Sequence, residues 1–240
     1  MSMQFGVLTD NLPYLLWGAY PDGPLGGAAL TVLLSIGSAL ASALLGLVLG
    51  IALSLARGWP HLLLTIVLGF FRAIPVLMLI FWTYFLLPIV FHVNVPGILS
   101  VMCALALIGG AYLAHSVHAG ISGIRAGQWD AGLSLGMTRI AVLRHIVLPQ
   151  ALQMMLPSFV NQWVTLIKDS SLAYIVGVGE LSFVAAQVNS RVMIYPAEIF
   201  MFIGLIYFVL CSGLGWLADR AAAYFQPPQN WQPDQAHLSI

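Results

Sequence analysis

Residues 25–56 read LGGAALTVLLSIGSALASALLGLVLGIALSLA and contain no Asp, Glu, Lys or Arg. A helix needs about 20 mostly apolar residues to cross the hydrocarbon core of a bilayer, and this stretch is longer. Lipid offers the backbone no hydrogen-bond partner, so a spanning segment is either a helix or a strand of a closed barrel. Barrel strands alternate apolar and polar residues, and this stretch does not. It therefore predicts a membrane-spanning helix, and its many small residues favour close helix packing.

Four further apolar runs follow and extend the same interpretation to most of the chain. Arg72 interrupts the first of these runs, and Lys168 and Asp169 lie within the third. The sequence thus predicts an all-α integral membrane protein with about five transmembrane helices. The four runs cover residues 62–91, 95–124, 152–179 and 199–218.

The composition fits a membrane protein and excludes several other classes. Hydrophobic residues make up 60% of the chain and charged residues 7%, against about 25% charged residues in soluble domains. Eight Lys and Arg balance eight Asp and Glu, so no basic patch is available for a nucleic acid. Cys103 and Cys211 both lie in apolar runs and indicate neither a disulfide framework nor a zinc cluster.

The basic residues predict the orientation of the chain. With five spans and the N-terminus outside, only Arg191 faces the outer side, while five arginines face the inner side. This distribution agrees with the positive-inside rule, and the flipped arrangement violates it. The residues before Leu25 contain no Lys or Arg and so lack the basic start of a signal peptide. The five inner arginines are Arg57, Arg125, Arg139, Arg144 and Arg220.

Motifs of the common catalytic sites do not occur in the sequence. Its one lysine, Lys168, does not follow a glycine-rich loop, so this chain cannot hydrolyse ATP by the P-loop route. His115 and His118 are three residues apart and can share one helix face. Two histidines form half of a metal site at most, so no metal site is predicted.

The longest inner loop predicts a compact helical projection. Residues 127–150 read GQWDAGLSLGMTRIAVLRHIVLPQ. We expect a short helix over 128–135, a turn at Gly136, and a second helix from about Arg139. Glycine suits the end of a helix because it tolerates positive φ. Pro149 then marks the start of the fourth span, since proline is tolerated in the first turn of a helix.

This loop resembles the Glu-Ala-Ala (EAA) loop of the permease subunits of bacterial ABC importers. That pattern has Glu-Ala-Ala, three residues, Gly, nine residues and Ile-x-Leu-Pro. Here Asp130-Ala131-Gly132 takes the first place, and Gly136 follows at the expected spacing. Ile146, Leu148 and Pro149 complete the pattern without a gap. The changes to Asp130 and Gly132 are chemically mild, although glycine weakens a helix by about 1 kcal/mol relative to alanine.

Other segments are similar to the polar amino acid subfamily of these permeases, and the likeness covers most of the chain, from about Leu12 to Arg220. They include Arg72-Ala73-Ile74-Pro75 and Gln128 within the loop. Leu148 to Ala151 and Lys168 to Leu172 match as well, and the glutamate/aspartate importer permeases are the most similar group. One departure concerns His115 and His118, which stand where the subfamily usually has Glu-x-x-Arg.

The resemblance implies a MetI-like permease fold and a division of labour between subunits. ATP and Mg²⁺ belong to a partner ABC ATPase dimer, and this chain binds no cofactor. A second permease subunit, identical or different, and a periplasmic amino-acid-binding protein complete the importer in the bacterial inner membrane. The ATPases move the inner loops and expose the pathway to alternate sides. The implied segments are a periplasmic N-terminal segment (residues 1–24), a membrane domain (residues 25–220) with its coupling loop at about 125–150, and a cytoplasmic tail (residues 221–240).

The resemblance also implies two sets of functional residues. The set for ATPase coupling comprises Gln128, Asp130, Ala131, Gly132, Gly136, Ile146, Leu148 and Pro149. The set for a translocation pathway or gate comprises Arg72, Pro75, His115, His118, Lys168, Asp169, Ser170 and Ser171.

Several alternatives stay open at this point. Arg72 is either a pathway residue or a boundary arginine that reaches the interface. For Lys168 and Asp169, the favoured interpretation is that they pair with groups on neighbouring spans and hold the bundle together. Asp130 either docks at the ATPase or only starts a helix. Two other classes are an ion-gradient-driven secondary transporter or channel subunit, which needs coupling carboxylates in its spans, and a scaffold without a pathway of its own.

Overall fold

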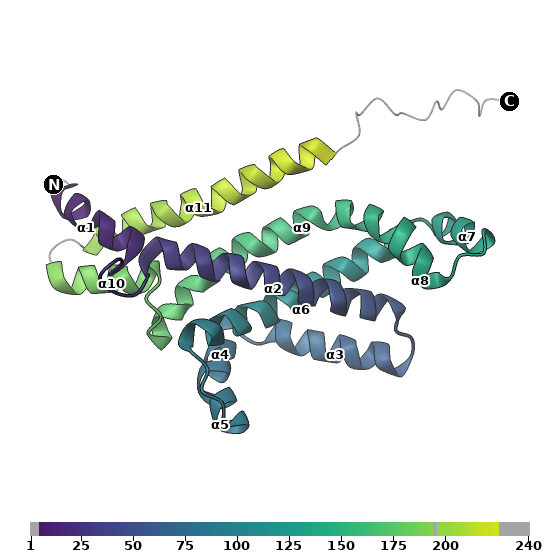
Figure 1. The fold of residues 1–240 in the computed structure, drawn as a ribbon, viewed down its shortest axis with the longest axis horizontal. Helices are drawn as coiled ribbons and strands as arrows, with labels where there is room; N and C mark the ends of the chain where they lie inside the picture. The colour runs from purple at the N-terminus through teal and green to yellow at the C-terminus, as the bar shows by residue number, and fades with distance from the viewer. Residues whose placement is uncertain (1–4, 194–195, 226–240) are drawn as a thin grey trace.

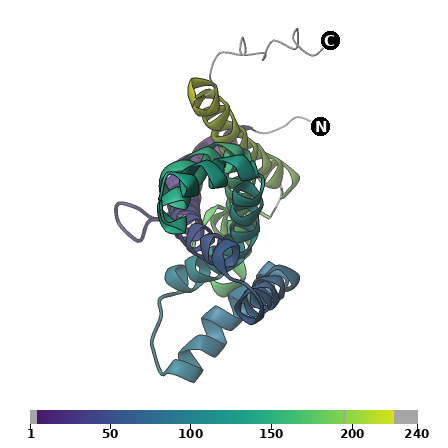
Figure 2. The same cartoon turned by 90° about the vertical axis from the view of Figure 1, so that its right-hand side faces the viewer.

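The protein is an elongated helical bundle in a computed structural model that describes residues 5–193 and 196–225 (Figure 1). The long helices α2 (Gly27–Leu55), α6 (Gly97–Ser122) and α9 (Leu148–Asp169) run along the long axis beside one another. Helix α11 (Pro196–Phe225) lies against α9 at one end and diverges from the bundle toward the other. The view down the axis shows the bundle in cross-section (Figure 2).

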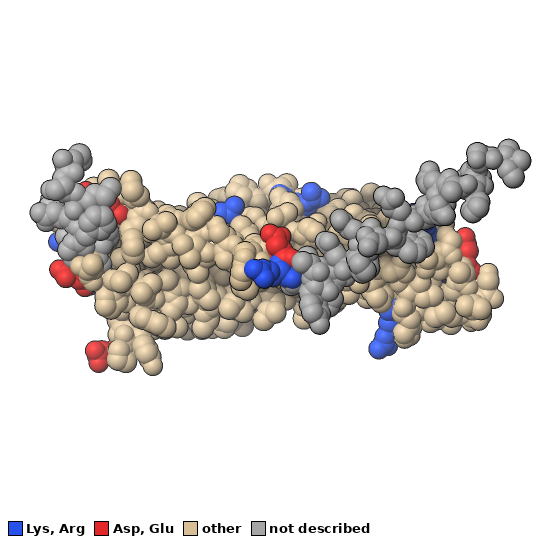
Figure 3. Space-filling view, turned by 90° about the horizontal axis from the view of Figure 1, so that it is seen from above, with Lys and Arg blue, Asp and Glu red and all other residues tan. Residues whose placement is uncertain are grey.

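Four helical stretches of the described residues are long and apolar enough to cross a membrane. They agree with four of the five predicted spans, and they are Gly27–Leu55, Gly97–Ser122, Arg139–Val176 and Pro196–Arg220. Charged side chains are thinly scattered over the surface (Figure 3). The predicted tail falls partly on residues 226–240, which lie outside the described residues.

Small residues bring α2 and α6 into close contact, as the sequence predicts. A Cβ added to Gly46 would lie 2.4 Å from the Cβ of Leu113, and one added to Gly50 would lie 2.6 Å from the carbonyl oxygen of Ala114. No side chain fits at these two positions without separating the helices. In lipid there is no hydrophobic driving force between helices, so van der Waals contacts between closely packed helices stabilise their association.

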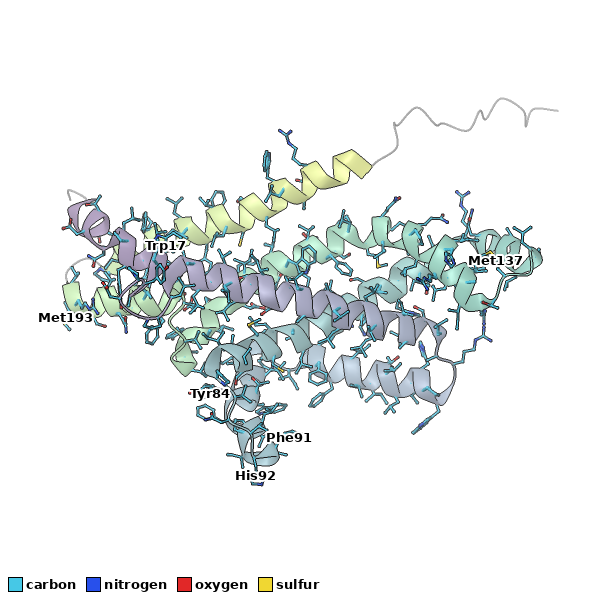
Figure 4. All side chains as sticks on the ribbon, in the orientation of Figure 1. Trp17, Tyr84, Phe91, His92, Met137 and Met193 are labelled. Atoms are coloured by element: carbon cyan, nitrogen blue, oxygen red, sulfur yellow. The ribbon has the colours of Figure 1, made fainter. Side chains whose placement is uncertain are left out.

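The predicted span over 62–91 is a bent pair of helices, which is long and apolar enough to cross a membrane when its two parts are taken together. The chain forms α3 (Trp59–Ala73) and then an arm that consists of α4 (Val76–Phe81), the π-helical η1 (Trp82–Leu86) and α5 (Leu87–Phe91). The arm is bent by 100° from α3. Ile74 is extended because the ring of Pro75 disfavours the helical conformation in the residue before it. Phe91 and His92 lie at the tip of the arm, away from the bundle (Figure 4).

The fourth predicted span begins much earlier than Leu152. Helix α8 (Arg139–Val142), the π-helical η2 (Leu143–Val147), α9 and the 3₁₀ segment η3 (Ser170–Val176) follow one another without a break. Pro149 lies in the first turn of α9, as expected, but the helical run continues without a break before it. This proline lies just after the π-helical turn, whose wider spacing accommodates a residue that cannot donate a backbone hydrogen bond.

Three shorter helices complete the fold. Helix α1 (Phe5–Trp17) and α10 (Leu181–Val192) pack together at one end, which is the predicted outer end. Helix α7 (Ala126–Ser134) lies at the opposite end, the predicted inner one, beside α8 (Figure 1). Only α7 was expected from the sequence. The outer end has its own buried cluster, which comprises Leu15, Ala28, Leu181, Val184, Ala185, Val188, Ile199 and Ile203.

Candidate functional site

A helix–turn–helix formed by α7 and α8 lies at the end of the bundle that is predicted to be the inner one, and we call it the inner knob (residues 126–142). Its turn lies at Gly136, which has φ +79°, so the predicted glycine turn is confirmed. The amide of Met137 donates to the carbonyl of Gly132 (3.2 Å), and the hydroxyl of Thr138 caps α8 by accepting from the amide of Ala141 (3.3 Å). Met137 marks this turn in Figure 4.

Gly132 explains how α7 lies so close to the next helix. A Cβ at this position would lie 2.7 Å from Cγ2 of Val142 and 3.1 Å from Cδ1 of Ile146. The exchange of alanine for glycine within the EAA-like motif therefore creates room for this crossing.

The inner knob rests firmly on the bundle. The side chains of Trp129, Ile146 and Leu148 pack against a buried cluster that includes Phe159. The Gln150 side chain donates to the carbonyl of Ile146 (2.8 Å) and to Oε1 of Gln128 (3.4 Å). Ile146 and Leu148 thus face the interior of the protein.

The outward face of the inner knob combines apolar side chains with one carboxylate. Leu135 is 82% exposed and Ile140 is 68% exposed. Asp130, Ala131 and Pro149 are exposed as well. Exposed apolar side chains rimmed by polar ones are typical of a surface that another protein covers.

A second candidate site is an open depression of about 490 Å³ between α3, α6 and α9. The Arg72 guanidinium lies 5.1 Å from the centre of the Tyr112 ring, and the Tyr112 hydroxyl donates to the Arg72 carbonyl (3.4 Å). Nε2 of His115 is buried and has no hydrogen-bond partner among the described residues. The depression is lined by Arg72, Tyr112, His115, Ser116, Ala119, Gly120, Met154, Met155 and Ser158.

The structure separates His115 from His118. Nδ1 of His118 lies 3.0 Å from the Ser54 hydroxyl of α2, and its ring centre lies 5.8 Å from that of His61. Nδ1 of His61 lies 3.1 Å from the carbonyl oxygen of Leu53. His118 therefore joins α2, α3 and α6, while His115 lines the depression. The described ranges contain no cluster of three side chains that could hold a metal ion.

The segment from Lys168 to Ser171 lies apart from the depression, at the junction of α9 and η3. Lys168 is exposed, and the Ser170 hydroxyl donates to the Ile167 carbonyl (2.7 Å). Neither Lys168 nor Asp169 forms an ion pair with another helix in the described part of the chain, and their role in holding the bundle together stays a prediction.

Sequence reasoning missed Tyr112, Met154 and Ser158 in the depression. Tyr112 lies three residues before His115, so helical spacing was a usable signal that both share one face. Met154 and Ser158 come from another helix, α9, and the sequence around them gives no signal that they lie near Arg72.

Residues 42–227 match the profile of a family described as binding-protein-dependent transport system inner membrane component. The chain belongs to this family. The matched range includes the inner knob, the depression and most of the membrane helices.

Curated relatives agree with this family. The chain is 37% identical over 142 residues to a probable amino-acid ABC transporter permease, PatM, from Vibrio harveyi, covering 58% of this chain and 63% of the relative. It is 34% identical over 148 residues to the glutamate/aspartate import permease GltK of Escherichia coli O157:H7, covering 58% and 65%. The glutamine transport system permease GlnP of Escherichia coli K12 is 30% identical over 213 residues, covering 85% and 94%. The alignments to the first two relatives thus span less than two thirds of their lengths.

Solved structures support the fold. A crystal structure of an amino acid ABC transporter with histidines superposes with a TM-score of 0.79 at 24% identity, covering 93% of this chain and all of the other. An inward-facing MetNI methionine ABC transporter gives a TM-score of 0.75 at 18% identity, covering 95% and 100%. The predicted MetI-like fold is thereby confirmed for this binding-protein-dependent transport component.

Proposed function

We propose that this chain is the permease subunit of an ATP-driven importer of polar amino acids. The observation that carries the proposal is the inner knob, which presents exposed Leu135 and Ile140 beside the Asp130 carboxylate on a rigid helix–turn–helix. Such a surface suits a groove on a separate ATPase, which supplies ATP and Mg²⁺. Of the predicted coupling residues, Asp130, Ala131 and Pro149 are available for direct contact, and Ile146 and Leu148 support the knob from inside.

The continuous helical run of residues 139–176 supplies the mechanical link. It begins within the inner knob and ends near the outer end of the bundle. A displacement of the knob by the ATPases is therefore passed to the membrane helices as a rigid-body motion. ATP binding and hydrolysis then shift the equilibrium between two conformations of the importer, which open the pathway to opposite sides of the membrane.

The depression supplies one wall of the pathway. It is open on one side and draws on only α3, α6 and α9, so this proposal requires a second permease subunit that faces it. A pair of permeases also provides two inner knobs for an ATPase dimer. In this arrangement the N-terminus faces the periplasm, where a binding protein delivers the solute to the outer loops.

Glutamate or aspartate is the proposed substrate. The Arg72 guanidinium at the depression attracts carboxylates and is oriented by the Tyr112 ring. The likeness to a glutamate/aspartate import permease supports this choice, while relatives also include permeases for glutamine and cystine. His115 at the same depression is a further candidate contact for the solute.

The test is substrate-stimulated ATP hydrolysis in proteoliposomes that contain this chain, its ATPase, the second permease and the binding protein. We expect stimulation by glutamate or aspartate and its loss in Gly136→Pro, which cannot adopt the positive φ of the turn. Gly127→Ala is the matched control because a Cβ there meets no atom within 4 Å.

Stimulation by another amino acid alone would retain the importer and reject the acidic substrate. Transport without any ATPase would reject the importer and favour the ion-driven class. Complex formation without transport of any solute would favour a scaffold.

A further inference from the structure

A buried carboxylate at the outer end is not used by the mechanism above. Glu180 is fully buried at the N-terminus of α10. Its Oε1 accepts from the amide of Phe183 (2.9 Å), and its Oε2 accepts from the amide of Ser182 (2.9 Å). The hydroxyl of Tyr207 on α11 donates to the same Oε2 (2.9 Å). One side chain thus caps α10 and ties it to α11.

The same position is joined to α2. The amide of Leu181 donates to the Thr31 hydroxyl (3.0 Å), and the amide of Gly27 donates to the carbonyl of Gly179 (2.9 Å). A Cβ added to Gly27 would lie 2.2 Å from the carbonyl oxygen of Leu15 in α1. The carboxylate of Glu180 therefore lies where α1, α2, α10 and α11 converge.

The electrostatics of this position depend on burial. Burial disfavours the charged carboxylate and raises the pKa of Glu180. The hydrogen bonds from Ser182, Tyr207 and Phe183 lower this pKa, but burial is the larger effect, and the resulting pKa is about 7. Tyr207 is the titratable side chain that contacts the carboxylate.

No described charged group shifts the pKa of Glu180 by its charge. The described charged groups on the surrounding helices near this end are Asp10 on α1, Arg191 on α10 and Glu198 on α11, and α2 has none. Arg191 is engaged elsewhere, with its guanidinium 5.0 Å from the centre of the Tyr14 ring.

We propose that Glu180 is a positioning residue that ties the outer end of α10 to α11 beside α2, and that its protonation favours this joined state because no described cation compensates the buried charge. If these helices separate, water reaches the carboxylate and its affinity for the proton falls. By linkage, the joined state binds the proton more tightly, so acid favours the joined state and rising pH favours separation. The effect on transport rests on the proposed function, whereas the effect on stability does not.

The first experiment measures thermal unfolding of the full chain in nanodiscs between pH 4.5 and 8.5. Because the pKa is raised in the folded state, stability falls as pH rises from about 4.5 to about 7 and then levels off. We expect the melting temperature to fall by about 10 °C across this window. Glu180→Gln removes this fall, and Glu198→Gln on α11 is the matched control that retains it.

An unchanged pH dependence in Glu180→Gln overturns the proposal, as does its loss in Glu198→Gln. If Glu180→Gln does not fold, Tyr207→Phe provides the second variant. It removes a hydrogen bond that lowers the pKa of Glu180, so the upper limit of the window moves to higher pH. A window that stays in place or moves to lower pH contradicts the proposal.

The second experiment measures uptake by the reconstituted importer at external pH 5.5 to 7.5. We expect uptake by the unaltered protein to rise severalfold with pH, and uptake by Glu180→Gln to be independent of pH in this range. A rise that persists in Glu180→Gln overturns the link to transport. If no variant transports any solute while the unfolding result holds, the proposed function fails and the role of Glu180 in joining the helices stands.

Discussion

At the scale of single residues, the surroundings of Arg72 bear on its two interpretations. The sequence allowed either a pathway residue or an interfacial arginine. In the structure its guanidinium lies over the Tyr112 ring at the depression that His115 also lines. The position of the side chain supports the pathway interpretation, because a guanidinium held by an aromatic ring is oriented for carboxylate recognition.

Replacement of Arg72 tests this interpretation. Arg72→Gln is expected to raise the KM for an acidic substrate by at least tenfold, because it removes a charge-assisted contact worth about 1.5–3 kcal/mol. Arg72→Lys is expected to restore part of the loss, since lysine keeps the charge but not the planar geometry. Uptake of labelled substrate in proteoliposomes measures both. An unchanged KM in Arg72→Gln would place Arg72 outside the pathway.

The turn of the inner knob gives a second prediction at this scale. Gly136→Ala is expected to destabilise the knob by about 1 kcal/mol, because a Cβ is disfavoured at φ +79°. Hydrogen exchange of the amides in residues 130–142 should then accelerate about fivefold. Gly127→Ala serves as the control, and equal exchange in the two variants would contradict the assigned turn.

At the scale of elements, the helical run of residues 139–176 connects the inner knob to the outer end. The sequence separated a loop helix from a span at Pro149, because proline usually stands at the start of a helix. The structure instead continues through a π-helical turn before Pro149. In the proposed mechanism, this continuity lets the inner knob and a membrane helix move as one body.

Interruption of this run tests its mechanical role. Insertion of Gly-Gly between Ser158 and Phe159 makes the middle of α9 flexible. We expect the complex to assemble while stimulation of ATP hydrolysis by the binding protein falls at least tenfold. The same insertion after Gly58, in the short connection between α2 and α3, is the control. Full stimulation in the α9 insertion would show that motion reaches the membrane by another route.

At the scale of the whole molecule, an open depression lies on one side of the bundle. A single chain provides one inner knob and one open wall, so a facing permease is expected to complete the pathway. The bend of 100° after α3 adds a projecting arm, which the sequence did not predict. Its cause is local, at Ile74 and Pro75, but its direction depends on packing against α6.

Disulfide cross-linking tests the paired arrangement. In a chain with Cys103 and Cys211 replaced by serine, Ser116→Cys is placed at the rim of the depression. If two copies of this chain face each other, we expect a cross-linked dimer on mild oxidation. Val48→Cys, on the exposed side of α2, is the control and should remain monomeric. Cross-linking only to a different permease would indicate a heterodimer, and no cross-link at all would contradict a facing pair.

The sequence alone determined the membrane class, four of the apolar helices and the glycine turn of the inner knob. These features depend on local properties: apolar length, the positive φ of Gly136 and the spacing of the EAA-like motif. Tertiary structure decided the rest. Arg72 meets Tyr112, His118 turns toward Ser54, and Glu180 meets Tyr207. Each contact joins residues from different helices, and a helix that is apolar on all sides carries no local signal for which neighbour each face will meet.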